Sequence, residues 1–401
     1  MCPTRGGTGG TLAPMNSGDV GVYVHVPFCE RVCPYCDFAV VGTRSLPAAR
    51  EAAYVEALVE ELGRRAAAFD ARPLASVYFG GGTPSLLEPA SISRVLEAIR
   101  ERFPGAPAET TLEVNPSTVE RARLPDFREA GVDRVSVGVQ SFDDLVLKRL
   151  GRAHRADEAH ATLAACRAAG FARISLDLIY AAPDQSEASL ANDLAEVVRF
   201  APDHVSAYEL TLEPETPFAA AAAKGALRLP GEDGAFGMQQ QAEAALADAG
   251  YARYEISSYA RPGAEAVHNR RYWERRPVLG LGVGAFSTEP TTSAHPHGVR
   301  TSNPRDLARY LAGVEAGTPP LREPLLPDTA RGEAVFLALR TRRGLVAAEF
   351  AAEFGGAPRA FFAHAIDELT GAGLLAESAA GDLTPTSDGL RLSDEVACCF
   401  V

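Results

Sequence analysis

Residues 20–36 of this chain read VGVYVHVPFCERVCPYC. The first seven, Val20–Val26, are mostly β-branched or aromatic, which predicts a strand. Three cysteines, Cys29, Cys33 and Cys36, follow within eight positions. Thiolates are the usual protein ligands of iron–sulfur clusters. The stretch therefore predicts a strand that leads directly into a cluster-binding segment.

The spacing of the three cysteines leaves more than one geometry open. Positions i, i+4 and i+7 share a helix face, but Pro27 and Pro34 favour a loop that wraps around a cluster. Three thiolates can hold three irons of a [4Fe–4S] cubane and leave the fourth iron open to an amino acid, which chelates through its amine and carboxylate. A zinc site with a distant fourth ligand and plain buried cysteines are the alternatives.

Short β-rich runs alternate with helical stretches between residues 20 and 210. This alternation predicts βαβ units, hence an α/β fold with a parallel sheet that curls into a partial (β/α)6 barrel. Functional groups are expected at the carboxyl ends of the strands. The expected strands are Val20–Val26, Leu74–Phe79, Thr110–Val114, Val132–Val139, Ala172–Ile179 and His204–Leu210, and the expected helices are Arg50–Phe69, Ile92–Phe103, Leu124–Ala130, Ala156–Ala169 and Leu190–Phe200.

The chain divides into four expected parts. Residues 1–18 are rich in Gly, Thr and Pro and are expected to be a disordered lead-in, within which Met15 is a candidate start. Residues 19–212 form the barrel, residues 213–318 extend it, and residues 319–401 form a smaller winged-helix-like module. The other expected elements are helices Gly237–Gly250, Arg331–Arg340 and Arg359–Gly371, the extended run Tyr251–Tyr259, the loop Thr291–Pro304 and a β-like run at Leu374–Leu392.

The composition is typical of a cytosolic globular protein, with 46% hydrophobic and 23% charged residues among 401. The net charge of −13 and the lack of a Lys/Arg run argue against a nucleic-acid partner. No apolar run reaches the roughly 18 residues that a membrane span needs, and no signal-peptide pattern is present at the N-terminus. The seven cysteines are an odd number, which argues against a disulfide framework.

Three sequence blocks accompany the Cys-x3-Cys-x2-Cys loop: YVHVPFC at 23–29, YFGGGTPS at 78–85 and VGVQSF at 137–142. Together they resemble the radical SAM superfamily, and within it the oxygen-independent coproporphyrinogen III oxidase group and its HemW branch. The resemblance covers nearly the whole chain. It implies that a cluster-bound S-adenosylmethionine (SAM) is cleaved by one electron to a 5′-deoxyadenosyl radical, while the barrel supplies position and excludes water.

The resemblance also implies a SAM pocket at the strand ends. Gly81, Gly82 and Thr83 follow the second strand, where glycines let backbone approach the SAM amino group. Arg152 suits the SAM carboxylate, because a guanidinium offers a fork of donors.

Two acidic residues on expected strands, Glu113 and Asp177, are costly to bury without a role. The resemblance implies that Asp177 contacts the ribose hydroxyls of SAM. It implies that Glu113 and Gln140 contact ribose or amino groups of SAM. It places Tyr23 near the cluster and the methionine portion of SAM, and Tyr35 near the adenine.

The segment HNRRYW at 268–273, with GLGVGAFS at 280–287, resembles the heme-associated motif of HemW proteins. Imidazole ligates heme iron, so the motif implies that His268 binds heme. Tyr272 and Trp273 suit a porphyrin face, and His268 and Tyr272 share one face if the segment is helical. The alternative is a structural histidine beside a core tryptophan.

True coproporphyrinogen III oxidases of the group carry a further cysteine two places after the third, where this chain has Phe38. The departure puts that decarboxylase activity in doubt and matches the HemW branch. The resemblance thus implies a heme chaperone that delivers heme to a haem-requiring membrane protein such as a respiratory oxidase. The alternatives are a coproporphyrinogen III dehydrogenase of porphyrin biosynthesis and a radical SAM enzyme with another substrate.

The implied partners are heme, the membrane client and an electron donor. A homodimer gated by SAM and the cluster is one arrangement that the resemblance allows. It also implies a cytoplasmic protein with peripheral contact to the cytoplasmic membrane through its recipient.

Overall fold

The computed structural model describes residues 18–400, so the predicted disordered lead-in lies outside the described residues except for Gly18. All six predicted strands are present, with bounds that agree with the prediction to within two residues. Adjacent members pair in parallel and in chain order, as the βαβ reading requires. They are β1 (Val20–Val26), β4 (Leu74–Gly81), β5 (Glu109–Val114), β6 (Arg134–Gln140), β7 (Arg173–Tyr180) and β8 (His204–Glu209).

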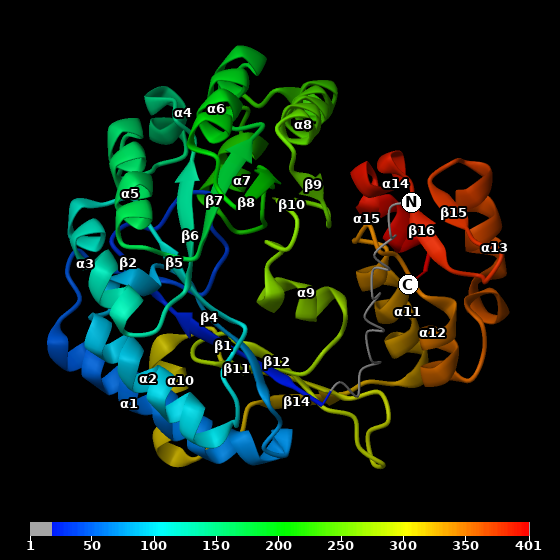
Figure 1. Ribbon diagram of the computed structural model, residues 1–401, viewed down its shortest axis with the longest axis horizontal. Coiled ribbons are helices and arrows are strands. Elements are labelled where there is room, and N and C mark those ends of the chain that lie inside the picture. Colours follow the sequence, from blue (N-terminus) through cyan, green and yellow to red (C-terminus); the bar gives the residue numbers. More distant parts are fainter. Residues whose placement is uncertain (1–17, 401) are drawn as a thin grey trace, which may run out of the picture.

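Helices cover the outer face of this sheet (Figure 1). Their apolar sides and the valines and leucines of the strands form the main hydrophobic core. One helix that the sequence reading missed, α4 (Asp144–Arg149), is too short to show a periodic pattern and begins where the Asp143 side chain caps Leu145 N. The predicted helices are α1 (Ala48–Arg65), α2 (Pro89–Arg102), α3 (Thr118–Glu129), α5 (Ala156–Ala168) and α6 (Glu187–Phe200).

Beyond β8 the chain adds strands to both edges of the sheet. A seventh parallel strand, β11 (Val278–Leu281), pairs with β1 on the side away from β4. The predicted loop at Thr291–Pro304 was wrong in part, because it contains β13 (Val299–Ser302), whose alternate side chains are buried. The antiparallel edge strands are β9 (Ala252–Arg253), β10 (Ser258–Ala260), β12 (Phe286–Glu289) and β14 (Leu321–Pro324), and the helices are α7 (Pro217–Ala223), α8 (Gly231–Asp248), α9 (Val267–Trp273) and α10 (Leu307–Ala316).

The C-terminal elements pack around a hydrophobic cluster of their own. They stand beside the barrel in Figure 1, with α9 between them and the sheet. The buried Arg275 links the two parts through ion pairs to Glu333 and Glu353, at 2.9 and 3.0 Å. The elements are α11 (Pro327–Ala338), α12 (Ala347–Phe354), α13 (Pro358–Gly371), β15 (Leu375–Glu377), β16 (Leu383–Pro385), α14 (Ser387–Arg391) and α15 (Ser393–Cys398).

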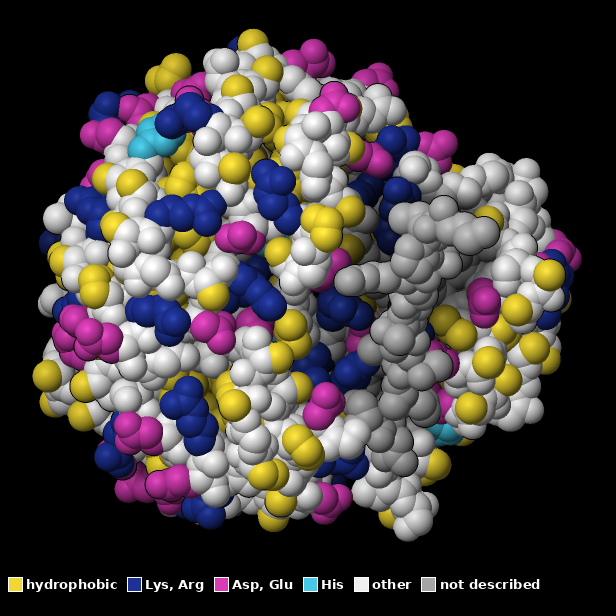
Figure 2. Space-filling model, viewed as in Figure 1, with side chains coloured by type: hydrophobic (Ala, Val, Ile, Leu, Met, Phe, Trp, Pro, Cys, Tyr) yellow, Lys and Arg dark blue, Asp and Glu magenta, His cyan; other side chains and the backbone are white. Residues whose placement is uncertain are grey.

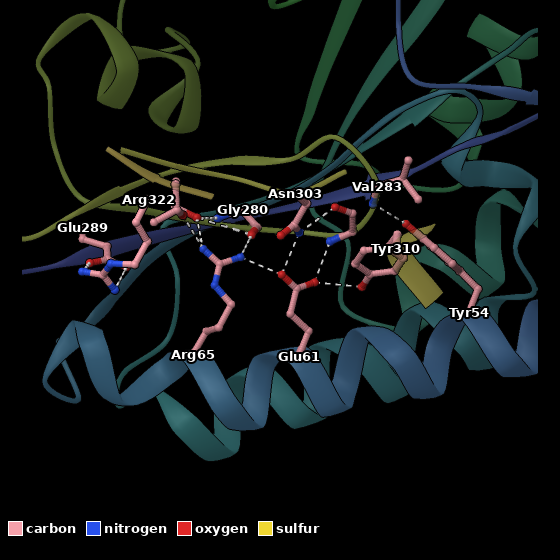
Figure 3. A network of polar contacts seen from close by, with 12 residues as sticks. Tyr54, Glu61, Arg65, Gly280, Val283, Glu289, Asn303, Tyr310 and Arg322 are labelled. Carbon is pink, nitrogen blue, oxygen red and sulfur yellow. Dashed lines mark hydrogen bonds and ion pairs between the residues drawn. The ribbon is translucent and has the colours of Figure 1, made fainter. Parts of the chain in front are cut away.

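A buried ion pair on α1 fixes the segment that joins β11 to β12 (Figure 3). Glu61 accepts hydrogen bonds from Arg65 (2.6 Å), Gly282 N (2.9 Å) and two side chains, Asn303 and Tyr310. Arg65 also donates to the Gly280 carbonyl and to two hydroxyls, so the charges are fully partnered. The network holds the glycine-rich 280–284 segment in one conformation.

Two surface properties bear on partners. Acidic and basic side chains are interspersed over most of the face in Figure 2. Among the described residues, no helix is both long enough and apolar enough to span a membrane.

Candidate cofactor site

A cavity of about 540 Å³ opens at the carboxyl ends of the parallel strands. This is the position that the barrel reading predicts for function. Eleven of the thirteen residues predicted as ligands or contacts line it: Cys29, Cys33, Tyr35, Cys36, Gly81, Gly82, Thr83, Glu113, Gln140, Arg152 and Asp177.

The cysteine segment is a loop and not a helix, as Pro27 and Pro34 predicted. Cys29 ends a short strand, β2 (Phe28–Cys29), that pairs with β3 (Val41–Gly42) and so closes the loop at its base. Cys36 N donates to the Cys33 carbonyl at 3.1 Å, which makes a tight turn between these two ligands. Burial raises the pKa of the Cys29 thiol to about 12.

The thiol donor set of this loop fits an iron–sulfur cluster. Among the described residues, no three Cys, His, Asp or Glu side chains converge as ligands of one metal ion. A cubane does not require convergence, because each thiolate binds a different iron. Gly82 adds a second fit: a Cβ there would lie 2.8 Å from the Phe28 carbonyl oxygen and 2.9 Å from Cys29 Sγ. Only glycine leaves the space beside the first ligand free.

Arg152 reaches the cysteine loop from the segment after β6. Its guanidinium donates to Cys33 Sγ at 3.5 Å and to the Gly138 carbonyl at 3.1 Å. It also donates to Asn115 Oδ1, while Asn115 Nδ2 donates to Thr83 Oγ1 at 2.7 Å. Asn115 thus ties three strand ends together. The sequence analysis does not single out Asn115, although its position directly after the predicted strand Thr110–Val114 was an available signal.

Two carboxylates lie at the floor of the cavity. Glu113 accepts from Tyr78 Oη at 2.8 Å and from Gly81 N at 3.0 Å. Burial, with a smaller contribution from the Asp177 carboxylate, raises the pKa of Glu113 to about 7. Asp177 accepts from Ser136 Oγ at 3.1 Å, and burial raises its pKa as well.

The cavity wall also includes groups that the sequence reading did not assign. Tyr208, Glu209 and Glu213 lie at or just after the end of β8. Gln140 ends β6 with a φ of 67°, a left-handed conformation that costs free energy in a non-glycine residue. Such strain is common where a side chain must point into a site.

Tyr23 lies outside this cavity. It lines a second cavity of about 310 Å³, here called the aromatic cavity, together with Phe38, Tyr272, Phe286 and Arg305. Asp37 and Phe38 line both cavities, so the two adjoin at the end of the cysteine loop. The Tyr23 ring stacks on Tyr78 with centroids 6.1 Å apart.

His268 is fully buried, with an exposed fraction of 0%. The segment is helical and places His268 and Tyr272 on one face, as the sequence predicted. His268 Nδ1 lies 3.0 Å from Ser76 Oγ, and Nε2 lies 3.2 Å from Tyr272 Oη. Burial, with Arg271 and Arg134 nearby, lowers its pKa to about 3, so the ring is neutral. Both ring nitrogens already have partners.

Sequence comparison places the chain among known proteins. A family profile described as "Radical SAM superfamily" matches residues 23–197, and one described as "HemN C-terminal domain" matches residues 325–394. The heme chaperone HemW of Lactococcus lactis is 33% identical over 88% of this chain and 90% of its own length. The heme chaperone HemW of Mycobacterium tuberculosis is 37% identical over 85% of this chain and 86% of its own. This chain belongs to the HemW family.

The HemW-family chain also shares its fold with a solved radical SAM enzyme. Coproporphyrinogen III oxidase (HemN) from Escherichia coli superposes with a TM-score of 0.81 at 27% identity, covering 95% of this chain and 89% of that one. The structure of this HemW-family member is thus similar to that of an oxidase, while its sequence is similar to those of proteins named heme chaperones.

Proposed function

We propose that this protein is a heme chaperone that carries a [4Fe–4S] cluster and SAM and delivers heme to a haem-requiring membrane protein. The observation that carries the proposal is its likeness, over 85% or more of its length, to two proteins named heme chaperones. Phe38 supports it, since a cysteine stands there in the oxidases that the chain resembles.

Cys29, Cys33 and Cys36 would hold the cluster. When bound, the cluster and SAM supply one-electron chemistry at the mouth of the barrel. The protein binds and orients SAM there: Arg152 has its donors at the cavity wall, and Glu113 and Asp177 offer acceptors. Tyr35 and Gln140 complete the wall.

Heme is the cargo, and the segment that carries His268 and Tyr272 is the proposed heme-binding element. An electron donor, a homodimer gated by SAM and the cluster, and peripheral contact with the cytoplasmic membrane through the client complete the proposal. The net charge of −13 does not favour a nucleic-acid partner.

A second candidate is coproporphyrinogen III dehydrogenation, which the structural likeness to the oxidase favours. In that case the protein is an enzyme of porphyrin biosynthesis. It would then have to catalyse the reaction without the cysteine that the oxidases have at the position of Phe38. The two candidates differ in what happens to a porphyrin: the chaperone binds it unchanged, and the oxidase removes two carboxyl groups from its precursor.

The test is a spectrophotometric hemin titration of the anaerobically reconstituted protein, beside a decarboxylation assay with coproporphyrinogen III. Saturable stoichiometric hemin binding without decarboxylation supports the chaperone. Weak, unsaturable binding with carbon dioxide release would return the assignment to the oxidase. The His268→Ala variant, with His364→Ala as a matched control on the exposed face of α13, shows whether the proposed element is involved.

A further inference from the structure

A third cavity, here called the α1–α10 cavity, lies between the helices α1 and α10 and the strand β14, and its volume is about 560 Å³. Among the described residues, none that lines it also lines the cofactor cavity or the aromatic cavity. Ligand cavities of proteins usually measure about 300–1,000 Å³. The α1–α10 cavity is therefore large enough for a small organic ligand of its own.

The floor of the α1–α10 cavity is the polar network of Figure 3. Glu61 accepts there from the side chains of Asn303 and Tyr310, at 2.7 and 2.8 Å. Arg65 donates to Glu61 at 2.6 Å and to the Gly280 carbonyl at 2.8 Å. Because these groups are already partnered, they form a fixed floor that needs no ligand to satisfy it.

The wall on the side of α10 is apolar. It is lined by Ala312, Gly313 and Val314 of the helix and then by Pro319 and Pro320. Proline fixes its own φ, which restricts the movement of this wall. Apolar walls with a few charged groups are typical of cavities that bind small organic molecules.

The charged groups of the α1–α10 cavity are mostly basic. Four arginines and two glutamates line it, although the whole chain carries a net charge of −13. Both glutamates are neutralised by a partner: Glu61 by Arg65 at 2.6 Å, and Glu289 by Arg322 at 2.8 Å. The cavity therefore has an excess of two positive charges and attracts anions rather than cations.

The two remaining arginines differ in what their side chains contact. Arg64 pairs with Glu60 and also donates to the Val314 carbonyl, so its guanidinium is already in use. The backbone N–H of Arg309 donates to Asp306 Oδ1 at 2.8 Å, but its guanidinium has no hydrogen bond or ion pair with any residue in the part of the chain that the structure describes. A guanidinium offers a fork of donors that matches a carboxylate, sulfonate or phosphate. Arg309 is therefore the open cationic group of this cavity.

We propose that the α1–α10 cavity binds a small organic anion and that Arg309 anchors the charged group of this ligand. The ligand carries one carboxylate, sulfonate or phosphate on an apolar body, which lies against the apolar wall of α10. Arg322, whose side chain is 48% exposed, adds to the positive field of the cavity. The site goes beyond the proposed function, because heme and SAM have other places in that proposal.

The test uses two probes that differ only in charge. Anilinonaphthalene sulfonate is an anion whose fluorescence rises when its rings leave water, and phenylnaphthylamine has the same rings without the sulfonate. Both are titrated into the full-length reconstituted protein, and the fluorescence gives the affinity of each.

Three variants are compared with wild type. Arg309→Glu reverses the charge of the proposed anchor. Gly313→Leu fills the cavity and should fold, because a Cβ at this helical position meets only Thr318 Cβ at 3.9 Å, an ordinary contact. Arg342→Glu is the matched control: its side chain is exposed, has no partner among the described residues and does not line the cavity.

The expected result is saturable binding of the sulfonate that Arg309→Glu weakens by about tenfold or more, the loss of one charge-assisted hydrogen bond. Gly313→Leu should abolish this binding, and Arg342→Glu should bind like wild type. The neutral probe should bind about tenfold more weakly than the sulfonate. An unchanged sulfonate affinity in either Arg309→Glu or Gly313→Leu, or equal affinities of wild type for the two probes, would overturn the proposal.

Hemin titration of the same proteins keeps this test apart from the proposed function. Arg309→Glu and Gly313→Leu should bind hemin as wild type does. Failure of all four proteins to bind hemin would contradict the chaperone and leave the anion site intact. Hemin binding that is lost only in Arg309→Glu and Gly313→Leu would show that the cavity holds heme, and would overturn the proposal of a separate ligand.

Discussion

Tyr78 donates its hydroxyl to Glu113 at 2.8 Å, and its ring lies 5.3 Å from the His268 ring. One buried side chain on β4 therefore contacts both the floor of the cofactor cavity and the residue behind the aromatic cavity. Phe38 lines both cavities, and Tyr78 contacts residues of both. A substitution that alters the shape of one cavity is therefore expected to alter the other.

Replacement of Gly82 by alanine should abolish cluster binding. The new Cβ would lie 2.8 Å from the Phe28 carbonyl oxygen and 2.9 Å from Cys29 Sγ, so backbone next to the first ligand must shift. Iron and sulfide content after anaerobic reconstitution measures the effect. Gly371→Ala, on α13 with no atom within 4 Å of the added Cβ, is the matched control. A Gly82→Ala protein with the iron content of wild type would show that the glycine is not needed.

Replacement of Glu113 by glutamine should change how stability depends on pH. The pKa of Glu113 is raised in the folded state from the ordinary 4.5 to about 7. Below about pH 4.5 the Glu113 carboxyl is protonated in both the folded and the unfolded protein, so its ionisation does not change the free energy of unfolding. As pH rises to about 7 the unfolded state loses its proton first, so the wild type loses stability relative to Glu113→Gln, by at most about 3 kcal/mol.

Chemical denaturation of both proteins at pH 5, 6, 7 and 8 gives this difference directly. A wild type that gains stability over Glu113→Gln as the pH rises would contradict the raised pKa, because a lowered pKa gives the opposite slope.

Removal of Glu61 should destabilise the fold more than removal of a surface partner. Glu61→Ala leaves the Arg65 charge buried and unpaired, which costs about 3–5 kcal/mol. Glu349→Ala, which breaks the surface pair with Arg343 at 2.6 Å, should cost less than about 1 kcal/mol. Urea denaturation compares the two. Equal losses of unfolding free energy in the two variants would show that the Glu61–Arg65 network in Figure 3 contributes no more stability than a surface ion pair.

Replacement of Phe38 by cysteine restores the residue of the oxidase pattern but should not restore oxidase activity. The change removes one phenyl ring from the aromatic cavity but leaves the HNRRYW segment unchanged, so hemin affinity should stay close to that of wild type. Hemin titration and carbon dioxide release from coproporphyrinogen III measure the two properties. Release by Phe38→Cys at an enzyme's rate would favour the oxidase assignment.

The parallel barrel and most of the cofactor site could be predicted from the sequence, because both depend on short-range patterns. Val20–Val26 is mostly β-branched or aromatic, and each of its five counterparts also contains β-branched residues, which favour buried strands. Cys29 and Gly82 come shortly after the ends of predicted strands, Asp177 lies within one, and the carboxyl ends of such strands meet at one edge of the sheet.

The features that the sequence did not reveal depend on long-range contacts. The strand Val299–Ser302 was mistaken for a loop because its partners in β12 lie 10–16 residues away in the sequence and its flanks are polar. Tyr23 stays a predicted contact near the cluster, and the structure shows that it lines the aromatic cavity, which the sequence did not reveal. Strand periodicity gives the face of a side chain but not the cavity that it meets. The burial of His268 likewise depends on β4, whose Ser76 only the fold brings beside its ring.

The most direct test of the account is heme transfer. Full-length protein loaded with hemin and its cluster is mixed with vesicles that contain a heme-depleted respiratory oxidase, and the absorbance spectrum and oxygen consumption of the vesicles are followed. The account predicts that heme leaves the protein, that the oxidase spectrum appears and that oxygen consumption returns. Heme that stays bound to the protein, or reaches the oxidase no faster than free hemin does, would contradict it.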